Sequence, residues 1–165
     1  MRPAILFLDT NILLDCPRLM DYRPIGRPLT LVVIPEVMRE LRGLAQSSGR
    51  GQAGPALQAL AGLEVLARRR GSAAGVSGGR AGVLFRILPG EPGSDVATDY
   101  QLVLRAKAEQ ARQRGAIVAV VTRDWGVAEL ARTERVRSIL IRGSFSSTQL
   151  ERGIAEHDTM LDMEL

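Results

Sequence analysis

A chain of 165 residues is long enough for one domain with a substantial core and too short for two of ordinary size. Its 45% hydrophobic and 24% charged residues exclude disorder throughout, and its formal charge of +4 predicts a surface that attracts polyanions. Cys16 and His157 are the only cysteine and histidine, which excludes within one subunit a disulfide framework, a Cys/His zinc site and a Ser-His-Asp or Cys-His catalytic set.

The first apolar run of the chain is short. Residues 4–8 (AILFL) are followed at once by Asp9, so this run is not the apolar core of a signal peptide. No uninterrupted apolar run approaches the length that spans a membrane. The sequence therefore predicts a cytoplasmic protein with no membrane partner.

Strands buried on both faces are predicted where the apolar run is continuous. The first is residues 4–8, and the second, residues 29–34, ends at Pro35, which suits the first turn of a following helix that carries Glu40. A second helix is predicted over residues 56–69, where leucines recur every three residues.

Glycine and serine are frequent near residues 46–55 and 71–94, which predicts flexible insertions on the surface. Within the second of these, residues 83–88 are apolar enough to predict a third strand. Ser94 or Thr98 is expected to cap a long helix that runs to about residue 114.

The last part of the chain alternates in the same way. Residues 117–121 predict a strand, residues 124–132 a short helix and residues 136–141 a final strand. Alternating strands and helices predict an α/β fold with a parallel sheet and helices on both faces, because parallel neighbours need crossover connections. The predicted domain is residues 1–143, and residues 144–165 are expected to form a C-terminal tail or a peripheral helix.

Four acids from four separate segments are predicted to meet beyond the carboxyl ends of the strands, where parallel sheets bind ligands. Asp9 follows the first strand, Asp124 the fourth, Glu40 lies on the helix after the second, and Asp99 lies early in the long helix. Their mutual repulsion would be offset by a hard divalent cation such as Mg²⁺ or Mn²⁺. Such an ion can activate water for attack on a phosphodiester.

Each acid taken singly also has a simpler explanation. Asp9 and Asp124 suit helix N-caps, Asp99 suits a favourable first-turn charge, and Glu40 suits a solvated polar face shared with Glu36. The occurrence of all four in this order favours the metal site.

The segments that carry these acids resemble the motifs of PIN-domain nucleases. They are residues 8–14 (LDTNILL), 33–41 (VIPEVMREL), 99–106 (DYQLVLRA) and 121–124 (VTRD). The resemblance extends over roughly residues 4–141 and is greatest to the PIN domains of PhoH-like proteins, although no ATPase half is present.

This resemblance implies a PIN-like fold with a central five-stranded parallel sheet, and Mg²⁺- or Mn²⁺-dependent hydrolysis of single-stranded or structured RNA. It implies that Asn11 and Thr122 support the metal-binding acids by hydrogen bonds. It also implies a homodimer, and either an RNA-processing enzyme or the toxin of a toxin-antitoxin pair with an antitoxin protein as partner. The metal-binding acids that it implies are Asp9, Glu40, Asp99 and Asp124.

Three assignments near this site stay open in the sequence. The glycine-rich stretch obscures the spacing before Asp99, so Asp95 is a rival for the third acid. Arg123 and Arg105 are candidates for holding the substrate backbone, and Trp125 suits core packing better than stacking on a base.

Two other functions compete with the nuclease. A phosphatase of the haloacid-dehalogenase kind also begins with an apolar strand and an aspartate, but it needs an acid where this chain has Asn11. A non-catalytic RNA-binding domain of PIN-like fold would be expected to have lost some of the acids, and all four are present here.

Overall fold

The computed structural model describes residues 1–22, 24, 26–47, 51–70, 83–88, 90–92 and 97–164, with the backbone alone over residues 66–70. Five parallel strands form one sheet in the order β3-β2-β1-β4-β5. The predicted α/β fold with a five-stranded parallel sheet is confirmed. The strands are β1 (Ala4–Leu8), β2 (Leu29–Val33), β3 (Val83–Ile87), β4 (Ile117–Thr122) and β5 (Arg137–Leu140).

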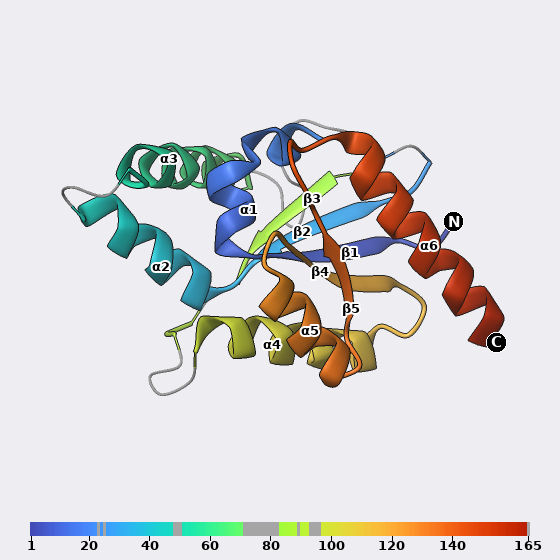
Figure 1. Cartoon of the computed structure of the whole chain (residues 1–165). Coiled ribbons are helices and arrows are strands. Elements are labelled where there is room, and N and C mark those ends of the chain that lie inside the picture. The colour runs from blue at the N-terminus through green and yellow to red at the C-terminus, as the bar shows by residue number, and fades with distance from the viewer. Residues whose placement is uncertain are drawn as a thin grey trace.

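Helices cover both faces of this sheet. In Figure 1, α4 and α5 lie below the sheet, whereas α1, α3 and α6 lie above it. Helix α2 contacts α1 and α3 from one layer and α4 from the other. The helices are α1 (Thr10–Asp15), the 3₁₀ helix η1 (Pro17–Asp21), α2 (Pro35–Gln46), α3 (Ala53–Arg70), α4 (Thr98–Arg112), α5 (Trp125–Thr133) and α6 (Ser147–Glu164).

The centre of the sheet is formed by the most apolar strands. Every residue of β1 and of β4 is buried, and β1 pairs with β4 from Ala4 opposite Ile117 to Leu8 opposite Val121. Strands β3 and β5 at the two edges are only partly buried and carry arginines. Continuous apolar runs thus occupy the positions that are covered on both faces, as the sequence predicts.

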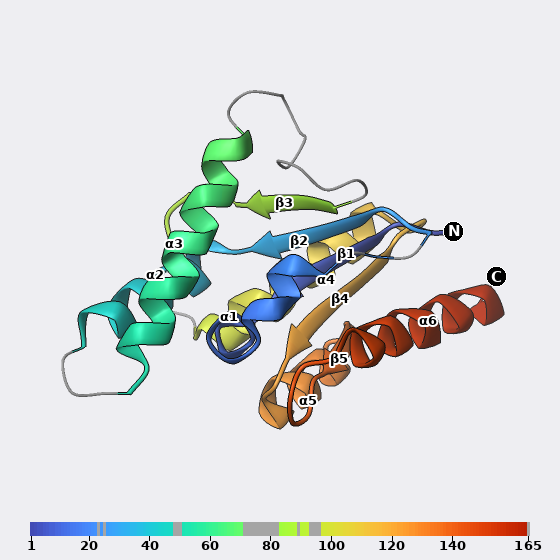
Figure 2. The same ribbon diagram turned by 90° about the horizontal axis from the view of Figure 1, so that it is seen from above.

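The strand order reverses between β1 and β4. From β1 the chain moves to β2 and β3 on one side, and then crosses back to β4 and β5 on the other. Figure 2 shows the arrowheads of β2, β3 and β4 pointing to the end of the sheet where α2 lies. A reversal of this kind leaves a crevice at the carboxyl ends of the two central strands, and ligands of open α/β sheets bind there.

Two details of the helices differ from the sequence prediction. Residues 53–55 were predicted to belong to a flexible insertion, but they form the first turn of α3, where Pro55 is tolerated because first-turn amides need no partner within the helix. The N-cap of α4 is Ala97 without a side-chain hydrogen bond, and Thr98 is its first helical residue. Ser94, the other expected cap, lies outside the described residues, as do residues 71–82 of the second predicted insertion.

The C-terminal residues form α6, which packs on β5 and β4 through buried Leu150 and Ile154. Gly153 permits this close approach, since a Cβ atom there would lie 2.8 Å from the side chain of Ile139. Asp158 then binds Arg2 and so ties α6 to the start of the chain, with 2.6 Å between the nearest atoms. None of the described helices has the length and apolar character needed to cross a membrane.

Candidate functional site

Asp9 lies at the carboxyl end of β1, at the point where the strand order reverses. It is the N-cap of α1, and its Oδ1 accepts a hydrogen bond of 2.8 Å from the amide of Thr10. Its Oδ2 accepts from the hydroxyl of Thr122 at 2.6 Å and from the amide group of Asn11 at 3.2 Å. The side chain is only 3% exposed, so these donors replace the water that a carboxylate normally binds.

The two residues expected to support the acids also fix the loop after β4. The Asn11 side-chain oxygen accepts a hydrogen bond of 3.0 Å from the backbone amide of Arg123. The Thr122 hydroxyl accepts one of 3.0 Å from the backbone amide of Asp124. The start of α1 and the start of α5 are therefore held together by side chains, and Asp9 and Asp124 are carried by the same rigid unit.

Glu40 and Asp124 join this unit through hydrogen bonds of their own. The hydroxyl of Thr10 donates to Glu40 Oε2 at 2.7 Å and so connects α1 with α2. Asp124 is the N-cap of α5, where its Oδ1 accepts from the amide of Gly126 at 2.7 Å. Asp99 lies in the first turn of α4 at the surface, where the neighbouring protein removes only part of its water, and it accepts no hydrogen bond from the described residues.

The charges of the acids reach one another's positions, and two of the four carboxylates have a raised pKa. The pKa of Asp9 is raised to about 6. Burial is the largest cause and the charges of Asp99 and Glu40 add to it, whereas the hydrogen bonds from Thr122 and Thr10 oppose it. Desolvation also raises the pKa of Asp99, to which the charges of Glu40 and Asp124 contribute. Acids from four separate segments thus form one electrostatic cluster at the carboxyl edge of the sheet.

The donor chemistry of this acid cluster (Asp9, Glu40, Asp99 and Asp124) suits Mg²⁺ or Mn²⁺, since both ions prefer carboxylate oxygens and water. Its geometry is not that of a formed site, because among the described residues no three Asp, Glu, His or Cys side chains are arranged to hold a metal ion. The hydrogen bonds explain the difference. One oxygen of Glu40 accepts from Thr10 and one oxygen of Asp124 accepts from Gly126, so these protein donors hold the two carboxylates where an ion would otherwise compete for them.

The burial of Glu36 differs most from the sequence prediction, in which this residue lies on a solvated polar face. The structure buries it completely, and Arg105 of α4 lies 2.9 Å from its carboxylate. Glu36 precedes Glu40 by one turn of α2, and Arg105 follows Asp99 in α4. This buried ion pair therefore joins the two helices that carry those acids. The sequence holds no signal for it, because the partners are 69 positions apart.

The other predicted residues have these positions. Arg123 directs its guanidinium toward Asp15 at 3.9 Å, and that of Arg105 is bound to Glu36, so substrate contact by either stays a prediction. Asp95, the rival third acid, lies outside the described residues. The expectation that Trp125 packs in the core is wrong, because 61% of this residue is exposed.

No family model matches the chain, and no curated protein sequence is significantly similar to it. Among solved structures, the chain is similar to a domain of a functionally unknown protein from Methanocaldococcus jannaschii DSM 2661. The two share 14% sequence identity with a TM-score of 0.56, over 87% of this chain and 94% of that one. At this identity the similarity shows a common fold and nothing more.

The raised pKa of Asp9 predicts how stability changes with pH in the absence of metal. A carboxyl whose folded pKa exceeds its unfolded value of 3.8 favours folding when protonated, and this contribution is lost as the pH rises from about 4 to about 6. The free energy of unfolding of the wild type, minus that of Asp9→Asn, should fall by about 3 kcal/mol across this window. Urea unfolding in EDTA at several pH values measures it.

Asp162→Asn is a suitable control, because Asp162 is a mostly exposed acid on α6. Its difference from the wild type should not reproduce the fall between pH 4 and 6. A constant difference between wild type and Asp9→Asn over the same window would show that Asp9 ionises normally and that the acid cluster is not strained by its charges.

Proposed function

We propose that this chain is a metal-dependent ribonuclease that binds Mg²⁺ or Mn²⁺ with Asp9, Glu40, Asp99 and Asp124. The observation that carries the proposal is the gathering of these acids at one edge of the sheet: burial is the main cause of the raised pKa of Asp9 and of Asp99, but the charges of Asp99 and Glu40 reach Asp9, and those of Glu40 and Asp124 reach Asp99. A cluster of like charges at the switch point of an open sheet is the arrangement that a divalent cation would stabilise. RNA is the substrate that the sequence resemblance to PIN-domain nucleases implies.

Each residue of the cluster has a separate task in this proposal. Asp9 is held by three donors and would provide a fixed ligand, whereas Glu40, Asp99 and Asp124 are less enclosed and would close on the ion. The bound ion would orient a water molecule and offset the charge that develops on the phosphodiester. Thr122 and Asn11 would keep the carboxylate of Asp9 in one orientation as the ion binds.

The test is cleavage of a labelled single-stranded RNA by the purified chain. Cleavage is expected with Mg²⁺ or Mn²⁺, none with excess EDTA, and recovery when metal is restored. Matched single-stranded DNA and a phosphatase substrate such as p-nitrophenyl phosphate separate this activity from its alternatives. Metal-dependent phosphatase activity without RNA cleavage would favour the haloacid-dehalogenase-like function, and metal-independent RNA binding without cleavage would favour a non-catalytic RNA-binding domain.

The biological setting of the proposed activity has two forms. A toxin would arrest growth on expression, would be encoded beside a small antitoxin gene and would be inhibited by that antitoxin. An RNA-processing enzyme would show none of these properties. In either form the proposed place of action is the cytoplasm, and the proposed assembly is a homodimer, which sedimentation at several concentrations would detect.

A further inference from the structure

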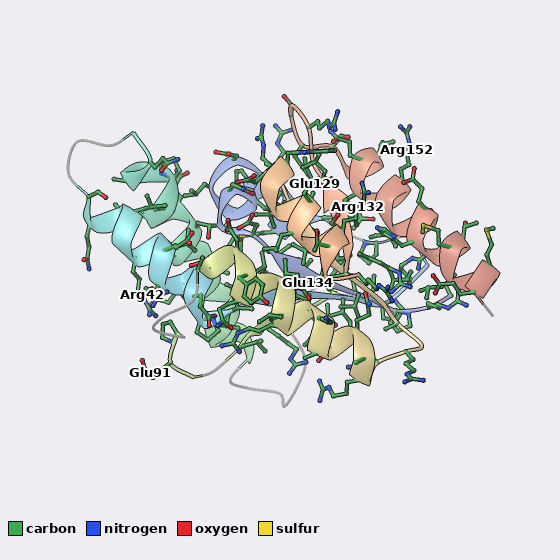
Figure 3. All side chains as sticks on the ribbon, turned by 60° about the horizontal axis from the view of Figure 1, so that its bottom comes forward. Arg42, Glu91, Glu129, Arg132, Glu134 and Arg152 are labelled. Carbon is green, nitrogen blue, oxygen red and sulfur yellow. The ribbon has the colours of Figure 1, made fainter. Side chains whose placement is uncertain are left out.

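A groove beside the acid cluster carries four arginines. It lies between α5, the edge strand β5 and α6, and has a volume of about 600 Å³. Figure 3 shows Glu129 and Arg132 on the side of α5 that faces α6. We call it the arginine groove, after the side chains that line it: Arg132, Arg135, Arg137 and Arg142.

The charge of the arginine groove is positive and only partly compensated. Its two acids are Glu129, 3.8 Å from Arg132, and Glu164, 3.3 Å from Arg137. Arg135 and Arg142 are exposed and form no ion pair within the described part of the chain. These two guanidinium groups are therefore available to a phosphate backbone.

An exposed tryptophan lies at the end of the arginine groove nearest to the acid cluster. Trp125 directly follows Asp124, lines the groove and is 61% exposed. The guanidinium of Arg142 lies over its ring, with the central carbon 5.9 Å from the ring centroid. With the arginine over one face of this exposed indole, the other face is the platform on which an unpaired base can stack.

Arg135 occupies a backbone position that favours glycine. Its φ is +58°, the only positive φ among the described residues other than glycine. It follows the C-cap of α5, where the amide of Val136 closes the helix by bonding to the carbonyl of Ala131 at 2.8 Å. Glycine is the usual residue at such a helix end, so an arginine here has a conformational cost that a side chain needed in the groove would explain.

The edge of β5 is partly closed to another β-strand. His157 of α6 donates from Nε2 to the carbonyl oxygen of Ser138 at 2.9 Å. This carbonyl is in the middle of β5, so a protein segment adding to the sheet there would have to displace the histidine. The groove is thus better suited to a charged, stacking ligand than to strand addition by a protein.

We propose that the arginine groove binds single-stranded RNA and leads it to the acid cluster, with one base on Trp125 and phosphates on Arg135 and Arg142. The inference rests on the proposed ribonuclease function and narrows its substrate to single-stranded RNA. A single strand is required because only an unpaired base can stack on Trp125. Trp125 is the first residue of α5 and Asp124 is the N-cap of the same helix, so a strand stacked on the indole would place a neighbouring phosphodiester near this acid.

The test is binding of a fluorescent single-stranded RNA in EDTA, which excludes cleavage. Trp125→Ala should weaken binding by about 5-fold to 150-fold, the loss of one stacked base, and Trp125→Phe should retain most of the affinity. Arg142→Gln and Arg135→Gly should each weaken binding. Each should also lower the magnitude of the slope of log K against the logarithm of the salt concentration by about 0.7, because one phosphate contact is lost. Arg135→Gly should also raise the Tm by about 2 °C, because it relieves the positive φ, so weaker binding could not be a folding defect.

The control is Arg152→Gln, since Arg152 is an exposed arginine of α6 that points away from α5 in Figure 3 and does not line the groove. Its affinity should equal that of the wild type. Wild-type affinity in the Trp125 and Arg142 variants, or equal binding of a duplex, would contradict the proposed RNA-binding role of the groove but not the proposed ribonuclease activity. If these substitutions weaken RNA binding but the wild-type protein does not cut RNA with metal present, the proposed ribonuclease activity is wrong and the RNA-binding role of the groove is kept. A dimer that these variants dissociate, with RNA binding unchanged, would identify the groove as a protein interface.

Discussion

Asp9→Asn and Asp124→Asn are each expected to lower metal-dependent RNA cleavage roughly 10²-fold to 10³-fold, the usual loss when one charge-stabilising group is removed. The substitution removes a negative charge and keeps the shape of the side chain. At Asp124 it also keeps the helix cap, because asparagine serves as an N-cap as well as aspartate does, and can still accept from the Gly126 amide. For Asp124→Asn the expected result is therefore a folded protein that has lost affinity for Mn²⁺, measurable by calorimetric titration alongside the rate of cleavage. Asp9→Asn leaves one acceptor for three donors, so its unfolding must be measured beside its activity.

Asp162→Asn makes the same chemical change at a mostly exposed acid of α6 that pairs with Arg2 and is not part of the acid cluster, and it should leave both quantities unaltered. A second comparison separates capping from ligation. Asp124→Ser preserves a good cap but provides a poorer ligand, so it should be stable and inactive. If Asp124→Asn and Asp9→Asn cut RNA at the wild-type rate with Mn²⁺, these acids do not hold a catalytic ion and the site assignment is wrong.

The sheet and the positions of the acids follow from local patterns in the sequence. A continuous apolar run such as Ala4–Leu8 can be buried only between other strands, and an aspartate directly after it must lie at the carboxyl edge. The same reasoning places Asp124 after β4. These inferences succeed because one strand and the residue following it are enough to make them.

The side-chain network between the elements could not be predicted in this way. The bond from Thr10 to Glu40 and the ion pair of Glu36 with Arg105 depend on how far α2 and α4 are rotated about their axes, which packing decides. Trp125 illustrates the opposite error. A lone tryptophan usually packs in a core, but the short helix α5 turns Val127 and Ala131 inward and leaves position 125 outside. A helix of nine residues is too short for its apolar pattern to show which face is buried.

Arg105→Met is expected to destabilise the protein by about 3–5 kcal/mol at neutral pH, the cost of removing one member of an ion pair whose carboxylate is buried. The carboxylate of Glu36 is completely buried, and the guanidinium 2.9 Å away is its ion-pair partner. Arg112→Met is the matched control, because Arg112 lies on the same helix and pairs with Glu109 at the surface. It should cost less than about 1 kcal/mol, since exposed ion pairs contribute little. Urea unfolding of both variants gives the comparison.

A double variant decides whether the loss comes from the buried charge of Glu36. Glu36→Gln with Arg105→Met removes both charges, so it should be more stable than Arg105→Met alone, and the cycle should yield a coupling energy between the two positions. Because the pair joins the helices that carry Glu40 and Asp99, Arg105→Met should also weaken Mn²⁺ binding under conditions in which it remains folded. Unchanged Mn²⁺ affinity in the folded variant would mean that the acid cluster is positioned by Thr10, Asn11 and Thr122 without help from this ion pair.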